Sequence, residues 1–183
     1  MKRSVLAVVS LAIVVAACGG SMTADEYVGD LNALAATGRS DFEAAADTYN
    51  QVAEPTLEDE LAFLDKEVAI RHEFLKGFEA LDPPGSITEV HRLLGDAFTR
   101  LTAAAEGLAV STGAASSIEE AEQTPEFAEY LAANDDGARV CLNVQAKLDD
   151  LAAVGEAFEN QPWLSGLGLA VRAAIGCGEI ETD

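Results

Sequence analysis

Apolar residues in this chain recur alternately three and four positions apart, and this spacing constrains the fold more than any other feature of the sequence. The longest such run comprises Tyr27, Leu31, Leu34, Gly38, Phe42, Ala45, Tyr49 and Val52. Residues at these intervals lie on one side of an α-helix, where they can pack against a neighbour. No stretch alternates apolar and polar residues for long enough to indicate a strand. The sequence therefore predicts an all-α protein.

Capping residues and prolines mark where the expected helices begin and end. A hydroxyl residue followed three positions later by an acid is a capping box, which satisfies the free N–H groups of the first turn. Proline ends helices because it has no backbone N–H to donate, and glycine ends them because its backbone does not favour the helical conformation. On these signals we expect a first helix from the Thr23 cap to Pro55, a second from the Thr56 cap to about Leu81, and a third from the Ser86–Glu89 capping box to about Ser111.

The remainder of the chain is expected to hold shorter helices and one more long helix. The predicted elements are a small-residue linker over 111–117, a turn capped by Ser117, a helix over 125–133 opened by Thr124 and Pro125, a turn over 134–137, a helix over 138–158, a break at Pro162 and a short helix over 167–175. Long helices joined by short connections favour an antiparallel bundle. The sequence thus predicts about four main helices plus short ones over residues 23–178, followed by an acidic tail over 179–183.

The charge balance excludes one class of partner. The chain of 183 residues holds 32 acidic and 11 basic residues, with a formal net charge of −21. Such a chain repels phosphates, so nucleic-acid binding is excluded and adhesion to anionic lipid heads is not expected. The excess charge favours solubility, and it would attract cationic partners or loosely held divalent ions. A solvated acidic surface or adaptation to a salty habitat would give the same composition.

The N-terminal residues have the pattern of an export signal. Lys2 and Arg3 precede an uncharged apolar stretch that ends in Val15-Ala16-Ala17-Cys18. A basic start, a short apolar core and small residues before a cleavage site are typical of a secretory signal peptide. Small residues that run directly into a cysteine resemble the lipobox of bacterial lipoprotein precursors.

The lipobox resemblance implies a location and a modification. In that family the cysteine is joined to diacylglycerol and becomes the first residue of the mature protein. It implies a signal peptide over residues 1–17, lipidation at Cys18, a tether over 18–22 and anchoring to the outer face of the bacterial cell membrane. Two alternatives remain open: a plain signal peptide cut after Ala17, and a transmembrane helix, for which the run is short of the roughly 20 residues required.

A second, weaker resemblance concerns the mature chain. The sequence Leu81-Asp82-Pro83-Pro84, followed by His91 and leucine-rich heptads, is similar to uncharacterised exported helical proteins of actinobacteria. This resemblance implies no activity. From the residues alone, the double proline predicts a rigid corner between two antiparallel helices.

Two cysteines remain after Cys18, and we expect them to form a disulfide. An even number of cysteines in an exported chain most often pairs. A bridge between Cys141 and Cys177 would close a loop of roughly 36 residues and contribute about 3–4 kcal/mol by restricting the unfolded chain. It would hold the C-terminal segment against an earlier helix.

No motif in the sequence specifies a chemistry. Carboxylate-bridged metal sites in helical bundles use Glu-x-x-His pairs, yet Ala69 precedes His72 and Thr88 precedes His91 at that spacing. A zinc-protease pattern that would begin at His72-Glu73 has Lys76 in place of its second histidine. No serine lies in a G-x-S-x-G motif. We therefore expect no metal, no cofactor and no catalytic residue, and we expect His91 to be a polar residue that is either exposed or between helices.

These observations leave three functional hypotheses. The first is a non-catalytic, lipid-anchored module that binds an unknown envelope protein or small ligand, with Trp163 and the segment 111–124 as possible contact residues. The second is a carrier for a small molecule or a lipid, with a cavity between the helices. The third is an enzyme whose site is assembled from isolated acids and histidines that no motif reveals.

Overall fold

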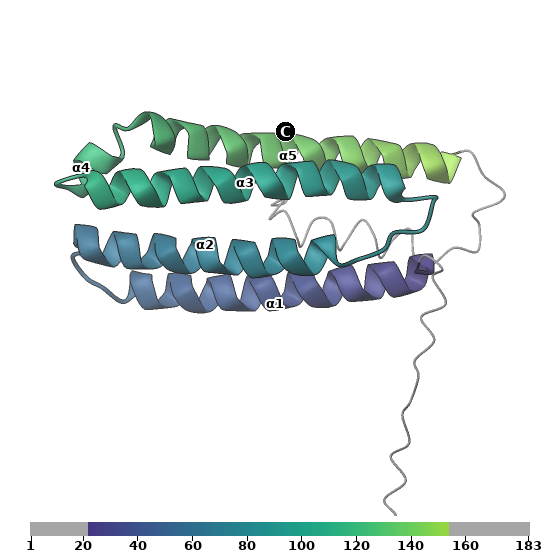
Figure 1. Cartoon of the computed structure of the whole chain (residues 1–183), viewed down its shortest axis with the longest axis horizontal. Coiled ribbons are helices and arrows are strands. Elements are labelled where there is room, and N and C mark those ends of the chain that lie inside the picture. Colours follow the sequence, from purple (N-terminus) through teal and green to yellow (C-terminus); the bar gives the residue numbers. More distant parts are fainter. Residues whose placement is uncertain (1–21, 154–183) are drawn as a thin grey trace, which may run out of the picture.

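The computed structural model describes residues 22–153, which form four long helices and one short helix. The helices are α1 (Ala24–Asn50), α2 (Leu57–Glu79), α3 (Thr88–Ala114), α4 (Ile118–Ala121) and α5 (Pro125–Ala153). Each long helix runs opposite to the one before it, so the predicted antiparallel helical arrangement is confirmed (Figure 1). No strand occurs within the described residues.

The long helices pack in chain order around one core. Helix α2 packs against both α1 and α3, and α5 packs against the other side of α3 (Figure 1). The main core cluster draws residues from all four long helices, and the largest fully buried members include Tyr27, Phe78, Leu94 and Val144. Burial of such side chains is the main favourable term for folding.

Two of the predicted capping boxes are confirmed. At the start of α1 the Thr23 hydroxyl accepts a hydrogen bond from the Glu26 N–H, and the Glu26 carboxylate accepts one from the Thr23 N–H. Thr56 and Asp59 form the same pair at the start of α2. The expected cap at the start of α5 is also present, since Thr124 accepts a hydrogen bond from the Phe127 N–H at 3.2 Å. These short-range signals depend only on neighbouring residues.

The third predicted capping box is wrong. The residue that caps α3 is Ile87, without a side-chain hydrogen bond, and the helix begins at Thr88. Ile87 is fully buried in the core cluster, and its N–H donates to the Pro84 carbonyl at 3.0 Å. Burial of Ile87 and the proline turn therefore set the helix start, in place of the Ser86 hydroxyl.

Two predicted interruptions are also wrong. Residues 111–114, expected to begin a linker, continue α3, where Thr112 is buried and the Ser111 hydroxyl donates to the Leu108 carbonyl. Residues 134–137, expected to form a turn, lie inside an unbroken α5. There Gly137 is buried and the Asn134 amide donates to the Tyr130 carbonyl at 2.8 Å. Packing of a long helix against α3 outweighs the turn preference of single residues.

Several predictions lie outside the described residues. These are the signal peptide over 1–17, Cys18 and most of its tether, the helix expected over 167–175, the break at Pro162, the contact residue Trp163, Cys177 and the acidic tail over 179–183. Cys141 lies on α5, but its side chain is not described. The Cys141–Cys177 bridge thus stays a prediction.

Candidate functional site: an acidic end and two polar clusters

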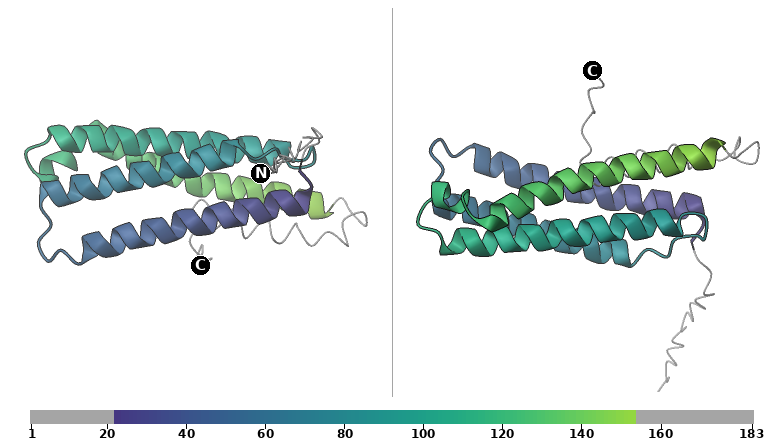
Figure 2. Two further views of the ribbon diagram at one scale, coloured as in Figure 1. Left: turned by 60° about the horizontal axis from the view of Figure 1, so that its bottom comes forward. Right: turned by 90° about the horizontal axis from the view of Figure 1, so that it is seen from above.

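The antiparallel fold gathers two distant parts of the sequence at one end of the molecule. The connections over 51–56 and 115–124 lie at the same end (Figure 2). Leu61 of α2 lies 3.7 Å from the Cβ position of Gly113 at the end of α3. At the opposite end, the Met22 N–H donates to the Asp82 carbonyl, so the start of α1 lies beside the connection from α2 to α3.

Charge is divided unevenly between these two ends. We define the acidic end as residues 40–65 and 101–138, and the near end as the rest of the described chain, which includes the start of α1. The acidic end holds no lysine or arginine; its acids are Asp41, Glu43, Asp47, Glu54, Glu58, Asp59, Glu60, Asp65, Glu106, Glu119, Glu120, Glu122, Glu126, Glu129, Asp135 and Asp136. Every lysine and arginine between residues 22 and 153 lies in the near end.

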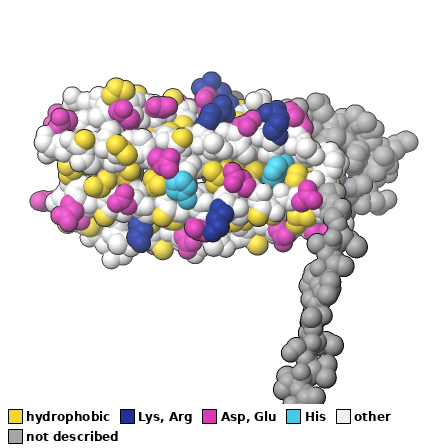
Figure 3. All heavy atoms as spheres, in the orientation of Figure 1, with side chains coloured by type: hydrophobic (Ala, Val, Ile, Leu, Met, Phe, Trp, Pro, Cys, Tyr) yellow, Lys and Arg dark blue, Asp and Glu magenta, His cyan; other side chains and the backbone are white. Residues whose placement is uncertain are grey.

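The surface of the molecule shows this division directly. On the face drawn in Figure 3, the left end carries acidic side chains and no basic ones, while the basic side chains lie nearer the centre and the right. Ion pairs of the acidic end occur at its boundary. Asp136 pairs with Arg139 at 3.4 Å, and Glu106 pairs with His72 at 2.6 Å. The acidic end therefore presents a largely uncompensated negative field.

The crowding of acids affects a tyrosine at this end. Tyr49 donates a hydrogen bond to the Glu60 carboxylate at 2.5 Å. This bond, partial burial and the negative charges of Glu60, Asp59 and Glu122 raise the pKa of Tyr49 to about 12. Glu122 follows α4, so its influence shows that α1, α2 and the α4 region meet in one electrostatic environment.

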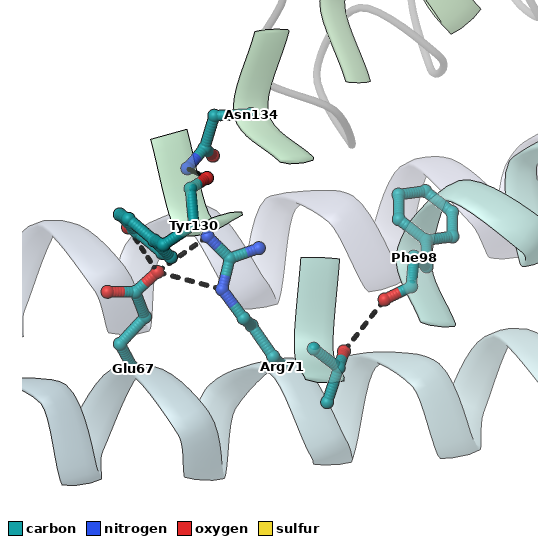
Figure 4. A network of polar contacts seen from close by, with 6 residues as sticks. Glu67, Arg71, Phe98, Tyr130 and Asn134 are labelled. Carbon is teal, nitrogen blue, oxygen red and sulfur yellow. Dashed lines mark hydrogen bonds and ion pairs between the residues drawn. The ribbon is translucent and has the colours of Figure 1, made fainter. Parts of the chain in front are cut away.

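A buried carboxylate links α2 to α5 beside the acidic end (Figure 4). Glu67 is only 1% exposed, and its Oε1 atom accepts hydrogen bonds from Nε and Nη2 of Arg71, at 2.8 and 2.5 Å, and from the Tyr130 hydroxyl at 2.8 Å. Desolvation, followed by the Glu67 charge, raises the pKa of Tyr130, which therefore keeps its proton. The second carboxylate oxygen, Oε2, is buried without a hydrogen-bond partner.

His91 belongs to an aromatic cluster at the near end. Its ring stacks on Phe78, with centroids 4.3 Å apart, and its Nδ1 atom shares a hydrogen bond of 2.9 Å with the Tyr27 hydroxyl. Tyr27 is fully buried. Desolvation lowers the pKa of His91 and raises that of Tyr27, so both are neutral near pH 7. His91 thus lies between helices, one of the two placements expected from the sequence.

The described residues hold no cluster of three or more His, Cys, Asp or Glu side chains suited to a metal ion. Nor is any described helix both long enough and apolar enough to cross a bilayer.

Comparison of the chain with protein-family models, with curated proteins and with solved structures finds no match. The functional argument therefore depends on the surface and on the polar clusters of this molecule.

Of the residues that the sequence singled out for binding, the structure describes only part. Segment 111–124 lies at the acidic end, where it forms the last turn of α3 and the whole of α4. Trp163, Cys18 and Cys177 lie outside the described residues. Sequence reasoning missed Glu67, because an acid within an apolar stripe resembles any surface acid until the neighbouring helix is known. It also missed the acidic end, although the absence of lysine and arginine over 40–65 and 101–138 could have been noticed.

Proposed function

We propose that this protein is a lipid-anchored, non-catalytic binding module of the cell envelope, and that its acidic end binds a cationic protein partner. The observation that carries this proposal is the separation of charge along the bundle. A tether before Thr23 holds the near end beside the membrane, so the acidic end is directed away from it. Complementary charge steers a partner to such a surface and accelerates its association.

The anchor is tested by Cys18→Ser. We expect this variant to leave the membrane fraction and appear in the soluble fraction once residues 1–17 are removed, because it cannot carry the lipid. Cys141→Ser is the matched control and should stay in the membrane fraction. Intact-mass measurement of the wild-type protein should show the added lipid. A wild-type protein whose mass lacks the lipid would exclude the proposed anchor.

The binding surface is tested by site-specific photo-crosslinking in cells that express the full-length protein. A photoreactive residue at Ala128, an exposed position of the acidic end, should give a discrete covalent product with a partner. The same residue at Ala33, an exposed position of the near end, should give none. Products from Ala33 alone, or from neither position, would contradict the proposal.

One observation favours the carrier hypothesis as a second candidate. The buried Oε2 atom of Glu67 has no hydrogen-bond partner, and an unsatisfied buried acceptor is costly. A hydroxyl or amino group of a small ligand between α2 and α5 would satisfy it. Native mass spectrometry of the Cys18→Ser protein, purified without denaturant, tests this candidate. A persistent added mass that is lost in Glu67→Leu would support it, and a bare protein would exclude it.

A further inference from the structure

One side of the bundle, at the seam between α2 and α3, combines exposed apolar residues with acidic ones. On α2, positions 58, 61, 65, 68 and 72 lie on one side of the helix, and on α3 positions 103, 106, 110 and 113 do the same. The two rows border each other, because His72 bonds Glu106 and Leu61 lies against Gly113. We call these nine positions the α2–α3 face.

Both rows of the α2–α3 face contain apolar residues. Val110 is 75% exposed, the most exposed of the large apolar side chains in the described chain. Ala103 and Gly113 beside it on α3 are also exposed, and Leu61 and Val68 of α2 are partly exposed. These apolar positions span about 15 Å along α3, from the rise of 1.5 Å per residue over the ten residues from Ala103 to Gly113, with Glu106 between them.

Acids alternate with these apolar residues along both rows of the α2–α3 face. Glu58 and Asp65 are exposed on α2, and Glu106 is exposed on α3, where His72 holds it. Apolar side chains lie between acidic ones along this seam in the left part of Figure 3. A face on which apolar and acidic side chains alternate complements an amphipathic helix that carries basic residues beside its apolar ones.

We infer that the α2–α3 face is the docking surface for a basic amphipathic helix of the partner. This inference rests on the proposed function and makes it more specific. Apolar side chains of the partner, spaced at i, i+3, i+4 and i+7, would cover Val110, Leu61 and Val68. Lysine or arginine side chains on its flanks would reach Glu58, Asp65 and Glu106. Apolar contact provides affinity for a helix, and the charges select a basic one.

The inference is tested with a model peptide of leucine and lysine, about 14 residues or 21 Å long when helical. Its leucines fall on one side, and a control peptide of identical composition distributes them around the helix. The protein is the whole chain from residue 18 with Cys18→Ser. We expect tighter binding of the amphipathic peptide by at least tenfold, with amide chemical-shift changes concentrated in residues 58–72 and 103–113.

Val110→Asp separates apolar contact from charge. The substitution adds a negative charge, which alone would favour a basic peptide, yet we expect it to weaken binding by about tenfold because it removes the central apolar contact. Val110→Ser should weaken binding by a smaller factor. Leu142→Asp is the matched control, since Leu142 is 53% exposed on α5 outside the face, and it should change binding by less than twofold.

Two results would overturn the inference. One is equal binding of both peptides, with shift changes spread over all the acids; the other is a Val110→Asp protein that binds as tightly as wild type. Either result would leave the proposed function untouched if Ala128 still gives its crosslink in cells. Loss of that crosslink, by contrast, would remove the proposed function itself, whatever the peptide does.

Discussion

Glu67 shows how one buried charge can fix the position of a helix. Its carboxylate is held by Arg71 from its own helix and by Tyr130 from α5. Burial removes water from the carboxylate, which costs free energy. Each hydrogen bond to the carboxylate offsets part of that cost. The Tyr130 bond therefore ties α5 to α2, two helices that both pack against α3.

Removal of the Tyr130 hydroxyl should destabilise the fold measurably. We expect Tyr130→Phe to lower the free energy of unfolding by about 1–2 kcal/mol, the usual cost of a lost hydrogen bond to a buried charged group. Tyr49→Phe is a matched control, because that hydroxyl also bonds a glutamate of α2, but in a more exposed setting. Its cost should stay below about 0.5 kcal/mol. If urea denaturation showed equal losses of stability in Tyr130→Phe and Tyr49→Phe, Glu67 would not be effectively buried.

His91 should make the stability depend on pH in a defined direction. Burial lowers its pKa in the folded state, so the unfolded chain binds a proton more readily. The contribution of neutral His91 is fully present above the ordinary histidine pKa of about 6.5 and is lost as the pH falls through the lower folded-state pKa. In the protonated ring Nδ1 carries a hydrogen, so the Tyr27 hydroxyl could then bond it only as an acceptor.

Denaturant unfolding at a series of pH values tests this effect. The loss of stability on acidification should be smaller in His91→Gln than in wild type, once each variant is referred to its own value near pH 8. His72→Gln provides the comparison at an exposed histidine and should follow the wild-type curve more closely. If His91→Gln and wild type gave parallel curves, His91 would not be the group responsible.

At the scale of the helix, replacing either of two glycines by alanine should change the stability of the protein in opposite directions. A Cβ at Gly29 of α1 would meet no atom within 4 Å, whereas a Cβ at Gly77 of α2 would lie 2.6 Å from Cδ1 of Leu34. Alanine is favoured over glycine inside a helix by about 0.5–1 kcal/mol. Gly29→Ala should therefore stabilise the protein by that amount. Gly77→Ala should lose this gain or destabilise, because Leu34 must move out of the α1–α2 contact.

Thermal unfolding followed by circular dichroism compares the two variants. Equal stabilisation by both substitutions would indicate that α1 and α2 approach each other less closely at Gly77 than the structure shows. A loss of stability in Gly29→Ala would contradict the open position of Gly29 on the surface of α1.

The starts of most helices could be predicted from local sequence. Whether a helix continued without interruption could not. The Thr23 and Thr56 capping boxes and the Thr124 cap act within one turn, and the structure confirms them. The interruption predicted at Asn134–Gly137 was wrong because Gly137 packs inside the bundle, a contact that residues far away in the chain supply. The Glu67–Tyr130 bond escaped prediction for the same reason, since its partners are 63 residues apart.

On the scale of the whole molecule, charge is the property that distinguishes the two ends. The acidic end has no lysine or arginine, so repulsion among its acids opposes folding there. We expect Glu129→Lys to raise the midpoint of thermal unfolding at low salt by about 1 °C, and added salt should remove the gain by screening. Asp30→Lys, at an exposed position of the near end, should have a smaller effect. If Glu129→Lys and Asp30→Lys raised the unfolding midpoint equally, the charge would be balanced alike at both ends.

The central claim, that the negative charge of one end recruits the partner, is most directly tested by neutralising equal numbers of acids at each end. Crosslinking from Ala128 in intact cells would be compared for two variants. One replaces Glu119, Glu122 and Glu129 by glutamine, and the other replaces Asp30, Asp82 and Glu79 by asparagine or glutamine, with the same change in net charge. We predict that the crosslinked product is mostly lost in the first variant and retained in the second. Equal yields in both variants would contradict the claim.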